Sequence, residues 1–229
     1  MYLKFYFYLI LCDSKPITMK FDSLRTSRFN HWIIIHLRYL VGFAFFPSGL
    51  VKLMGERFTR ISTDEPIGYF FEALYQSGFY WNFLGLAQIT AGILLMTQRY
   101  ATLGALMFLA ILTNIWIITI SLSFKGTWVI TSLMMVAVLV LVIWDQHKLR
   151  PIFNYNKAST VKEYPDPGYN WIIAGVVYAI SCIALYMLDP VKGEPYEKWL
   201  FKALVLLILT TFSISNYKAY KNHKLAVNT

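Results

Sequence analysis

The sequence predicts an all-α fold, a polytopic membrane helical bundle with six transmembrane helices. Hydrophobic residues make up 57% of the 229 residues and charged residues only 14%, whereas ordinary soluble domains are about 45–50% apolar. The apolar residues also gather in runs of about 20, the length that crosses roughly 30 Å of hydrocarbon as a helix. These runs are too long and too uniformly apolar to be the strands of a barrel.

The spans and their connections divide the chain into five parts. A basic leader, residues 1–30, comes first, and its true start is open between Met1 and Met19. The spans follow at about residues 31–54, 80–97, 101–121, 127–145, 171–189 and 199–217. We therefore predict a four-helix core over residues 31–145, a Pro-containing linker at 146–170, two further transmembrane helices within 171–217, and a basic tail at 218–229.

The connection after the first span is long enough to contain a helix of its own near residues 66–77. Pro66 suits a first helical turn, and Phe70, Phe71 and Leu74 would then share one side of the helix. This segment could be a helix lying in the membrane interface or a lid over an outward-facing cavity, and the sequence leaves both interpretations open.

The positive residues predict the orientation. Most Lys and Arg residues of the connections lie on the side of the N-terminus, so both the N-terminus and the C-terminus are predicted to be cytoplasmic. The formal net charge of +9 is spread over these connections rather than gathered in one patch, and nucleic acid is therefore not an expected partner. The expected location is a cytoplasmic (inner) membrane, crossed several times.

Glycines and basic residues share one face of the first span. Arg38, Gly42, Gly49 and Lys52 fall within a sector of roughly 80° on a helix. Gly42 and Gly49 are predicted to permit close helix packing. Arg38 lies about two turns inside the cytoplasmic end, where its charge must reach the headgroups or find an acceptor.

On the second span, Gly85, Gln88 and Gly92 share a face, so Gly85 and Gly92 are also predicted helix-packing positions. Gln88 and Asn114 are amides deep within spans and need hydrogen-bond partners. Bonds between helices that hold the bundle together are one explanation for both amides.

The alternative is a binding site built from Arg38, Gln88 and Asn114. One cation and two amides could surround a carbonyl, a sulfur oxyanion or a lipid headgroup. Lys52 and Lys202 are interpreted as headgroup anchors near the ends of their spans.

Other chemistries have little support in the sequence. Acids occur only at the ends of the clear spans, at Asp145 and Asp189, so a relay of buried carboxylates is not predicted. Cys12 and Cys182 are far apart, and no His spacing resembles a ligand pair, so no metal and no intrinsic cofactor are expected. Catalytic residues stay unknown.

Several segments resemble the DoxX-like family of integral membrane proteins. They are Leu37–Gly42, Ser48–Leu53, Phe83–Leu95, the basic turn at Arg99 and Ala101–Ala105, and the resemblance covers about residues 34–145. It implies a four-helix DoxX-like core in a bacterial membrane, with the last two spans as an extension. The chain departs from the family at Gln88, where many relatives carry an acid, so no proton-handling role is carried over to that position.

Three alternatives for function are left open, and the resemblance implies the second of them. The first is a noncatalytic subunit of a membrane complex that binds lipid or quinone. The second is a subunit of a quinone-linked sulfur or thiol oxidoreductase, with Arg38, Gln88 and Asn114 holding the sulfur oxyanion or the quinone oxygen. The third is a small-solute transporter. Quinone is the cofactor these alternatives suggest, and the expected partners are membrane lipids, a membrane or redox subunit, or a second copy in a homo-oligomer.

Overall fold

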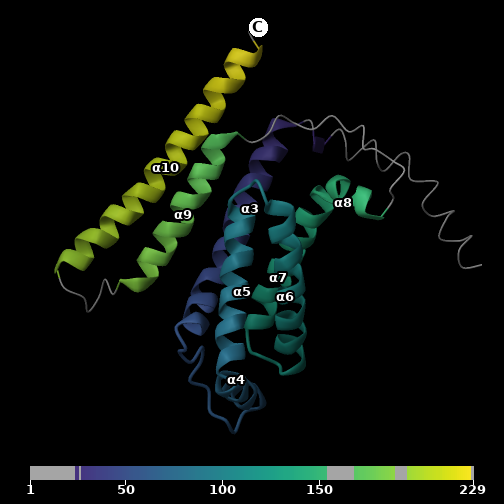
Figure 1. Cartoon of the computed structure of the whole chain (residues 1–229), viewed down its shortest axis with the longest axis vertical. Helices are drawn as coiled ribbons and strands as arrows, with labels where there is room; N and C mark the ends of the chain where they lie inside the picture. The colour runs from purple at the N-terminus through teal and green to yellow at the C-terminus, as the bar shows by residue number, and fades with distance from the viewer. Residues whose placement is uncertain (1–23, 26, 154–167, 189–194, 228–229) are drawn as a thin grey trace, which may run out of the picture.

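The computed structural model describes residues 24–25, 27–153, 168–188 and 195–227. Its long helices are α3 (Arg28–Leu53), α5 (Phe79–Met96), α6 (Ala101–Ser121), α7 (Thr127–Trp144), α9 (Tyr169–Met187) and α10 (Pro195–Val227), and its short ones are α4 (Pro66–Gln76) and α8 (Gln146–Phe153) (Figure 1). The described residues form no strand, and six of their helices are long and apolar enough to cross a membrane. The chain is therefore a polytopic helical membrane protein.

The helix boundaries differ from the predicted ones mainly near the ends of the chain. Helix α3 begins at Arg28, and the rest of the predicted leader lies almost wholly outside the described residues. Helix α8 occupies the start of the predicted linker. Residues 154–167 of that linker are also outside the described residues. Helix α10 continues to Val227 and takes in most of the predicted tail, because Lys and Ala are good helix formers that extend the last span.

Helices α3, α5, α6 and α7 form a four-helix bundle. Helix α5 lies between α3 and α6, and α7 closes the bundle by packing against both α6 and α3. The core is filled from all four helices, with Val41 and Phe45 from α3 meeting Leu95, Phe108 and Val138. The rings of Phe45 and Phe108 stack with their centroids 3.5 Å apart, which ties α3 to α6 across the bundle.

Glycines of α3 and α5 make a close helix contact in the bundle. A Cβ atom on Gly85 would lie 2.6 Å from the carbonyl oxygen of Gly49, and one on Gly92 would lie 2.7 Å from that of Gly42. Side chains at these positions would collide with backbone, so only glycine allows this approach. The four glycines singled out in the sequence thus all lie in one helix interface.

Helices α9 and α10 form a hairpin beside this bundle. Helix α9 packs against α3 and α5 through Tyr39, Trp171 and Tyr178. Helix α10 packs mainly on α9, and only 6% of its most apolar stretch is buried. In Figure 1 the hairpin slants away from the bundle, with α10 on its outer side.

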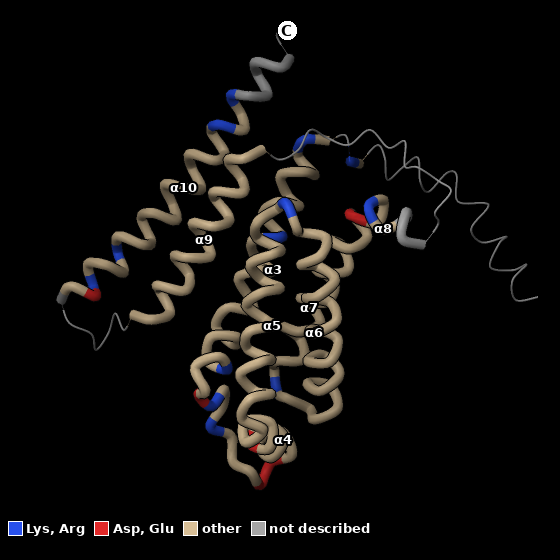
Figure 2. Tube along the Cα trace, viewed as in Figure 1, with Lys and Arg blue, Asp and Glu red and all other residues tan. Residues whose placement is uncertain are grey.

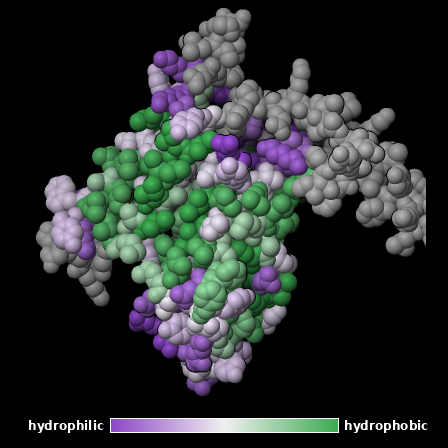
Figure 3. All heavy atoms as spheres, viewed as in Figure 1, coloured by the Kyte–Doolittle hydropathy of each residue, from purple (hydrophilic) through white to green (hydrophobic). Residues whose placement is uncertain are grey.

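The surface has the distribution of polarity expected for a membrane protein. Charged residues are sparse along the middle of the helices and gather toward the two ends of the bundle (Figure 2). The space-filling view shows hydrophobic side chains over the middle of the molecule and hydrophilic ones above and below them (Figure 3). Exposed residues such as Leu133, Val136 and Ile180 have no protein neighbour to cover them, and lipid tails would do so.

Candidate functional site

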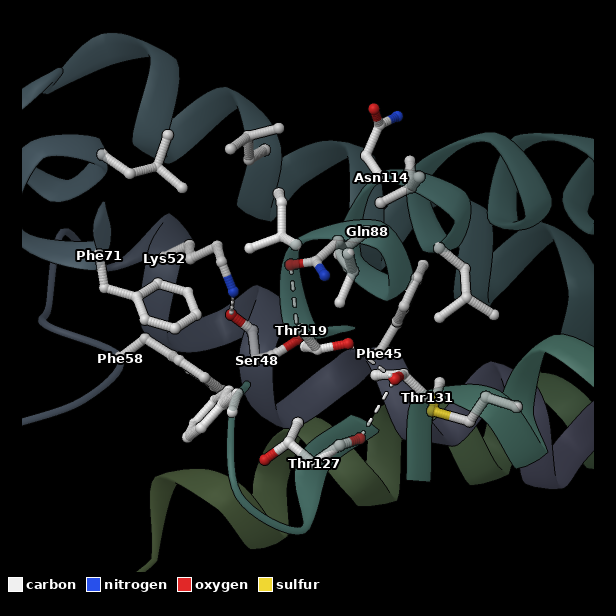
Figure 4. A pocket seen from close by; sticks show the side chains of 18 of the residues that line it. Phe45, Ser48, Lys52, Phe58, Phe71, Gln88, Asn114, Thr119, Thr127 and Thr131 are labelled. Carbon is white, nitrogen blue, oxygen red and sulfur yellow. Dashed lines mark hydrogen bonds between the residues drawn. The ribbon is translucent and has the colours of Figure 1, made fainter. Parts of the chain in front are cut away.

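A chamber of about 520 Å³ lies inside the α4 end of the bundle. Its wall is contributed by α3, α5, α6 and α7, and side chains of α4 and of the preceding loop close its end. Most of the lining is aliphatic or aromatic; the polar lining residues are Ser48, Lys52, Tyr80, Gln88, Asn114, Thr119, Thr127 and Thr131 (Figure 4). The volume lies within the roughly 300–1,000 Å³ of typical ligand sites.

The glycine interface explains why polar groups meet at this chamber. Because Gly49 and Gly85 let α3 and α5 touch, Ser48 and Gln88 are neighbours across the interface. Ser48 Oγ lies 3.4 Å from Gln88 Oε1 and donates to it. Gln88 is only 2% exposed, and its Nε2 has no hydrogen-bond partner among the described residues, so both N–H donors of that group stay available beside the chamber.

Lys52 lines the same part of the chamber and is 7% exposed. Its Nζ donates to the carbonyl oxygen of Ser48 at 3.0 Å. It also lies 4.5 Å from the ring centre of Phe58 and 5.1 Å from that of Trp81. The prediction that Lys52 is a headgroup anchor is therefore wrong, because its side chain folds back along its own helix toward these rings instead of extending outward.

Asn114 contributes to the chamber wall, but its amide points away from the other polar groups (Figure 4). The residue is exposed, and its Nδ2 donates to the carbonyl oxygen of Ala110 on the same helix at 2.9 Å. This intrahelical bond satisfies the amide without a second helix. Asn114 therefore neither joins two helices nor faces Gln88.

Arg38 belongs to a separate polar cluster at the opposite end of the bundle. Its Nη2 lies 2.9 Å from both carboxylate oxygens of Asp145, and its Nη1 donates to Gln98 Oε1 at 3.1 Å. Thr102 Oγ1 donates to Asp145 Oδ2 at 3.0 Å. The cluster is buried and links α3 to the start of α6 and the end of α7.

The predicted site of Arg38, Gln88 and Asn114 is therefore not assembled. Ser48, which contacts Gln88, is ten residues beyond Arg38 on α3, and ten helical residues span about 15 Å. Arg38 does not line the chamber. Its acceptor is Asp145, which the sequence shows only as an acid at the end of a span; an arginine inside one span and an acid at the same, cytoplasmic end of another were the available signal.

Helix α4 closes the chamber with Phe70, Phe71 and Leu74, the side that the sequence predicted to be shared. An ion pair holds α4 to the preceding loop: Arg57 Nε lies 2.9 Å from Glu72 Oε2, and Nη2 donates to Oε1 at the same distance. Hydrogen bonding from Arg57, supported by Gln76, lowers the pKa of Glu72 to about 2. This pair therefore stays ionised over the physiological pH range.

Lys202, the second predicted anchor, is exposed on α10 with its Nζ 5.3 Å from the ring centre of Trp199. A lysine beside an indole at the end of a span suits the membrane interface. Among the described residues, no three His, Cys, Asp or Glu side chains are grouped to hold a metal ion.

Comparison with known proteins places these features in a family. A family model described as DoxX matches residues 33–121, from α3 to the end of α6. A relative from Bacillus subtilis (strain 168), described as "Uncharacterized protein YwoB", is 30% identical over 128 residues, which cover 51% of this chain and 79% of the relative. The chain belongs to the DoxX family. No solved structure matches it significantly.

The segment that matches the family model contains residues of both polar sites of this DoxX protein. Ser48, Lys52 and Gln88 all lie inside the matched segment, as do Arg38 and Gln98. Asp145 and the chamber residues Thr127 and Thr131 lie on or after α7, beyond its end. The part of the chamber wall formed by α3, α5 and α6 is thus within the family segment, whereas the part formed by α7 and the acid that neutralises Arg38 are not.

Proposed function

We propose that this DoxX protein is a noncatalytic subunit of a membrane complex and that its chamber holds a membrane-soluble molecule, a lipid or a quinone. One observation carries the proposal: an apolar chamber of about 520 Å³ has donors from Lys52 and Gln88 beside it. Apolar walls with a few convergent polar groups are the usual architecture of a small-molecule site.

The ligand would be hydrophobic over most of its length. Phe45, Phe71 and Ile111 are typical of the walls, and the lining includes Tyr80 and Ile130, whose side chains are also exposed on the outside of the bundle. A molecule dissolved in the bilayer could enter from that side without crossing water. Lys52 and Gln88 would then bind its oxygen atoms and set its orientation.

A binding role is favoured over catalysis by this chain because the described lining contains no His, Cys, Asp or Glu. Imidazole, thiol or carboxylate catalysis would need such groups beside the ligand, and we assign Lys52, the basic residue of the described lining, to binding. A bound quinone would supply its own redox chemistry, and a partner subunit would exchange electrons with it. Such a partner could lie on the exposed apolar face of α10, because only 6% of the most apolar stretch of this helix is buried.

The positive residues of the connections support a cytoplasmic membrane location with both termini inside. In that orientation the α4 end faces outward, and α4 lies as a lid between the chamber and the outer surface. The Arg57–Glu72 ion pair would hold the lid in place.

The test is to purify the protein gently from its own membrane and to identify tightly bound molecules by mass spectrometry of the extract. We expect one lipid or quinone per chain. Ala44→Phe, which fills the chamber from α3, should remove it, whereas the matched change Ala184→Phe on the hairpin helix α9 should not. A wild-type protein that carries no stoichiometric lipid or quinone would contradict the proposal.

A further inference from the structure

Lys52 is a buried cation without an anionic partner. Among the residues that the structure describes, the carboxylates in ion pairs are bound to Arg38, Arg57 and Lys148, and none is bound to Lys52. Only one of its three protons has an oxygen acceptor, the carbonyl of Ser48. The rings of Phe58 and Trp81 face the ammonium group and stabilise it only in part.

Such an arrangement is costly within a membrane protein. A charge removed from water loses its hydration, and the usual compensation is an opposite charge with good hydrogen bonds. Arg38 shows that this chain provides such compensation elsewhere, because Asp145 binds it through both carboxylate oxygens. The ammonium group of Lys52 instead lies beside a chamber whose walls are otherwise largely apolar.

The groups that contact Lys52 and Ser48 add donors toward the chamber. Ser48 Oγ donates its proton to Gln88 Oε1. The two N–H donors of Gln88 Nε2 and two protons of Lys52 remain without an acceptor among the described residues. A ligand that satisfies them must bring several acceptor oxygens and a negative charge.

We propose that the chamber binds an amphiphile with an anionic head, a carboxylate or a phosphate, whose charge pairs with Lys52 and whose oxygen atoms accept from Gln88 Nε2. The apolar tail would lie along the aromatic and aliphatic wall toward α6 and α7. This inference rests on the proposed function and makes it narrower, because it distinguishes an anionic lipid or fatty acid from a neutral quinone.

The test uses the full chain in nanodiscs of phosphatidylcholine, which carries no net charge, and measures saturable binding of tritiated oleate by scintillation proximity. Unlabelled oleate and its uncharged methyl ester compete for the site, at a pH at which the carboxylate is ionised. We expect the ester to compete about tenfold more weakly, since it cannot form a charge-assisted bond to Lys52. A second labelled probe, phosphatidylglycerol, distinguishes a phospholipid head from a free carboxylate.

Three variants test whether binding of the anionic probe depends on Lys52. Lys52→Met should lower the affinity for the anionic probe about tenfold, and Lys52→Arg should retain most of it because the charge is kept. Lys202→Met is the matched control, since Lys202 is an exposed lysine on another span, and it should leave binding unchanged. Circular dichroism and gel filtration of each variant show whether it is folded.

The wild-type comparison remains decisive even if Lys52→Met does not fold. Tight binding of oleate or of phosphatidylglycerol, with weak competition by the ester, supports the inference and identifies the source of the anion. Equal competition by ester and acid, or saturable binding of a neutral quinone alone, would overturn the inference and leave the proposed function standing. If none of these molecules bound saturably and the purified protein carried no lipid or quinone, both would fall.

Discussion

Arg38 and Lys52 lie on the same helix, α3, and both are buried, yet the two ends of the bundle treat their charges differently. At the α8 end, Arg38 is held by Asp145, Gln98 and hydrogen bonds that connect three helices. At the α4 end, Lys52 meets one backbone carbonyl and two aromatic rings beside a chamber. Asp145 neutralises Arg38 within the fold, whereas the described fold brings no anion to Lys52, and we propose that a ligand neutralises that second cation.

The largest effect should come from breaking the neutralised end. Asp145→Ala leaves the Arg38 guanidinium buried without its anion, and the loss of one partner of a buried pair costs about 3–5 kcal/mol. The midpoint of unfolding in detergent should fall accordingly. Lys148→Ala is the control, because that lysine is 46% exposed and its Nζ lies 3.9 Å from Asp145; it should cost below about 1 kcal/mol. Equal effects of the two variants would show that Arg38 does not depend on Asp145.

The next effect should come from the glycine interface that connects the two ends. A Cβ on Gly85 would lie 2.5 Å from the backbone nitrogen of Leu53, so Gly85→Ala should force α3 and α5 apart at a cost of about 1–3 kcal/mol. The same unfolding measurement checks this value. Leu86→Met changes the adjacent, lipid-exposed position and should have little effect; a stable Gly85→Ala protein would mean that the interface can adjust.

The accessible end should respond differently to loss of its charge. Lys52→Met removes a buried cation that has no anionic partner among the described residues. The free energy of unfolding of the ligand-free protein should therefore fall by no more than about 1 kcal/mol, or should rise. Unfolding midpoints measured after delipidation check this prediction. A loss as large as that of Asp145→Ala would mean that Lys52 is as structural as Arg38, and the contrast between the two ends would disappear.

The smallest effect should come from the ion pair of the lid. Arg57→Ala releases Glu72, and a looser α4 should shorten the residence time of the bound probe while the unfolding midpoint stays nearly unchanged, because exposed ion pairs stabilise little. Dissociation of tritiated oleate or phosphatidylglycerol checks this, with Arg60→Ala as the control on the same loop. An unchanged dissociation rate would show that the pair does not restrain the lid.

The pH dependence of this pair has a definite sign. The folded-state pKa of Glu72 is lowered from 4.5 to about 2, so its contribution is fully present above the ordinary value and is lost as the pH falls toward the folded one. Arg57 stays charged throughout that range. Dissociation of phosphatidylglycerol, whose phosphodiester stays ionised to lower pH than the carboxylate of oleate, should therefore accelerate from wild type only in strongly acidic solution, and the Arg57→Ala variant should lack that acceleration.

Local features of the amino-acid sequence specify the helical membrane fold, the positions of its spans and the glycine faces of α3 and α5. Runs of about 20 apolar residues specify spans because lipid offers no partner for an open backbone. The spacing of Gly42 and Gly49, repeated by Gly85 and Gly92, specifies matching small faces, because helical periodicity is a local property of each chain segment.

The contacts of each polar residue in the spans depend instead on how the helices pack against one another. Arg38 and Asp145 are 107 residues apart, and no local pattern says that α7 ends beside α3. Asn114 lies on α6, which is apolar on all sides, so periodicity could not show that its amide would turn outward. Lys52 could have extended to the membrane surface; that it turns inward depends on Phe58 and Trp81, which reach it from a loop and a second helix. The partner of a polar side chain, its depth in the membrane and the direction in which it points all depend on packing between helices. The pattern within one segment therefore cannot specify them.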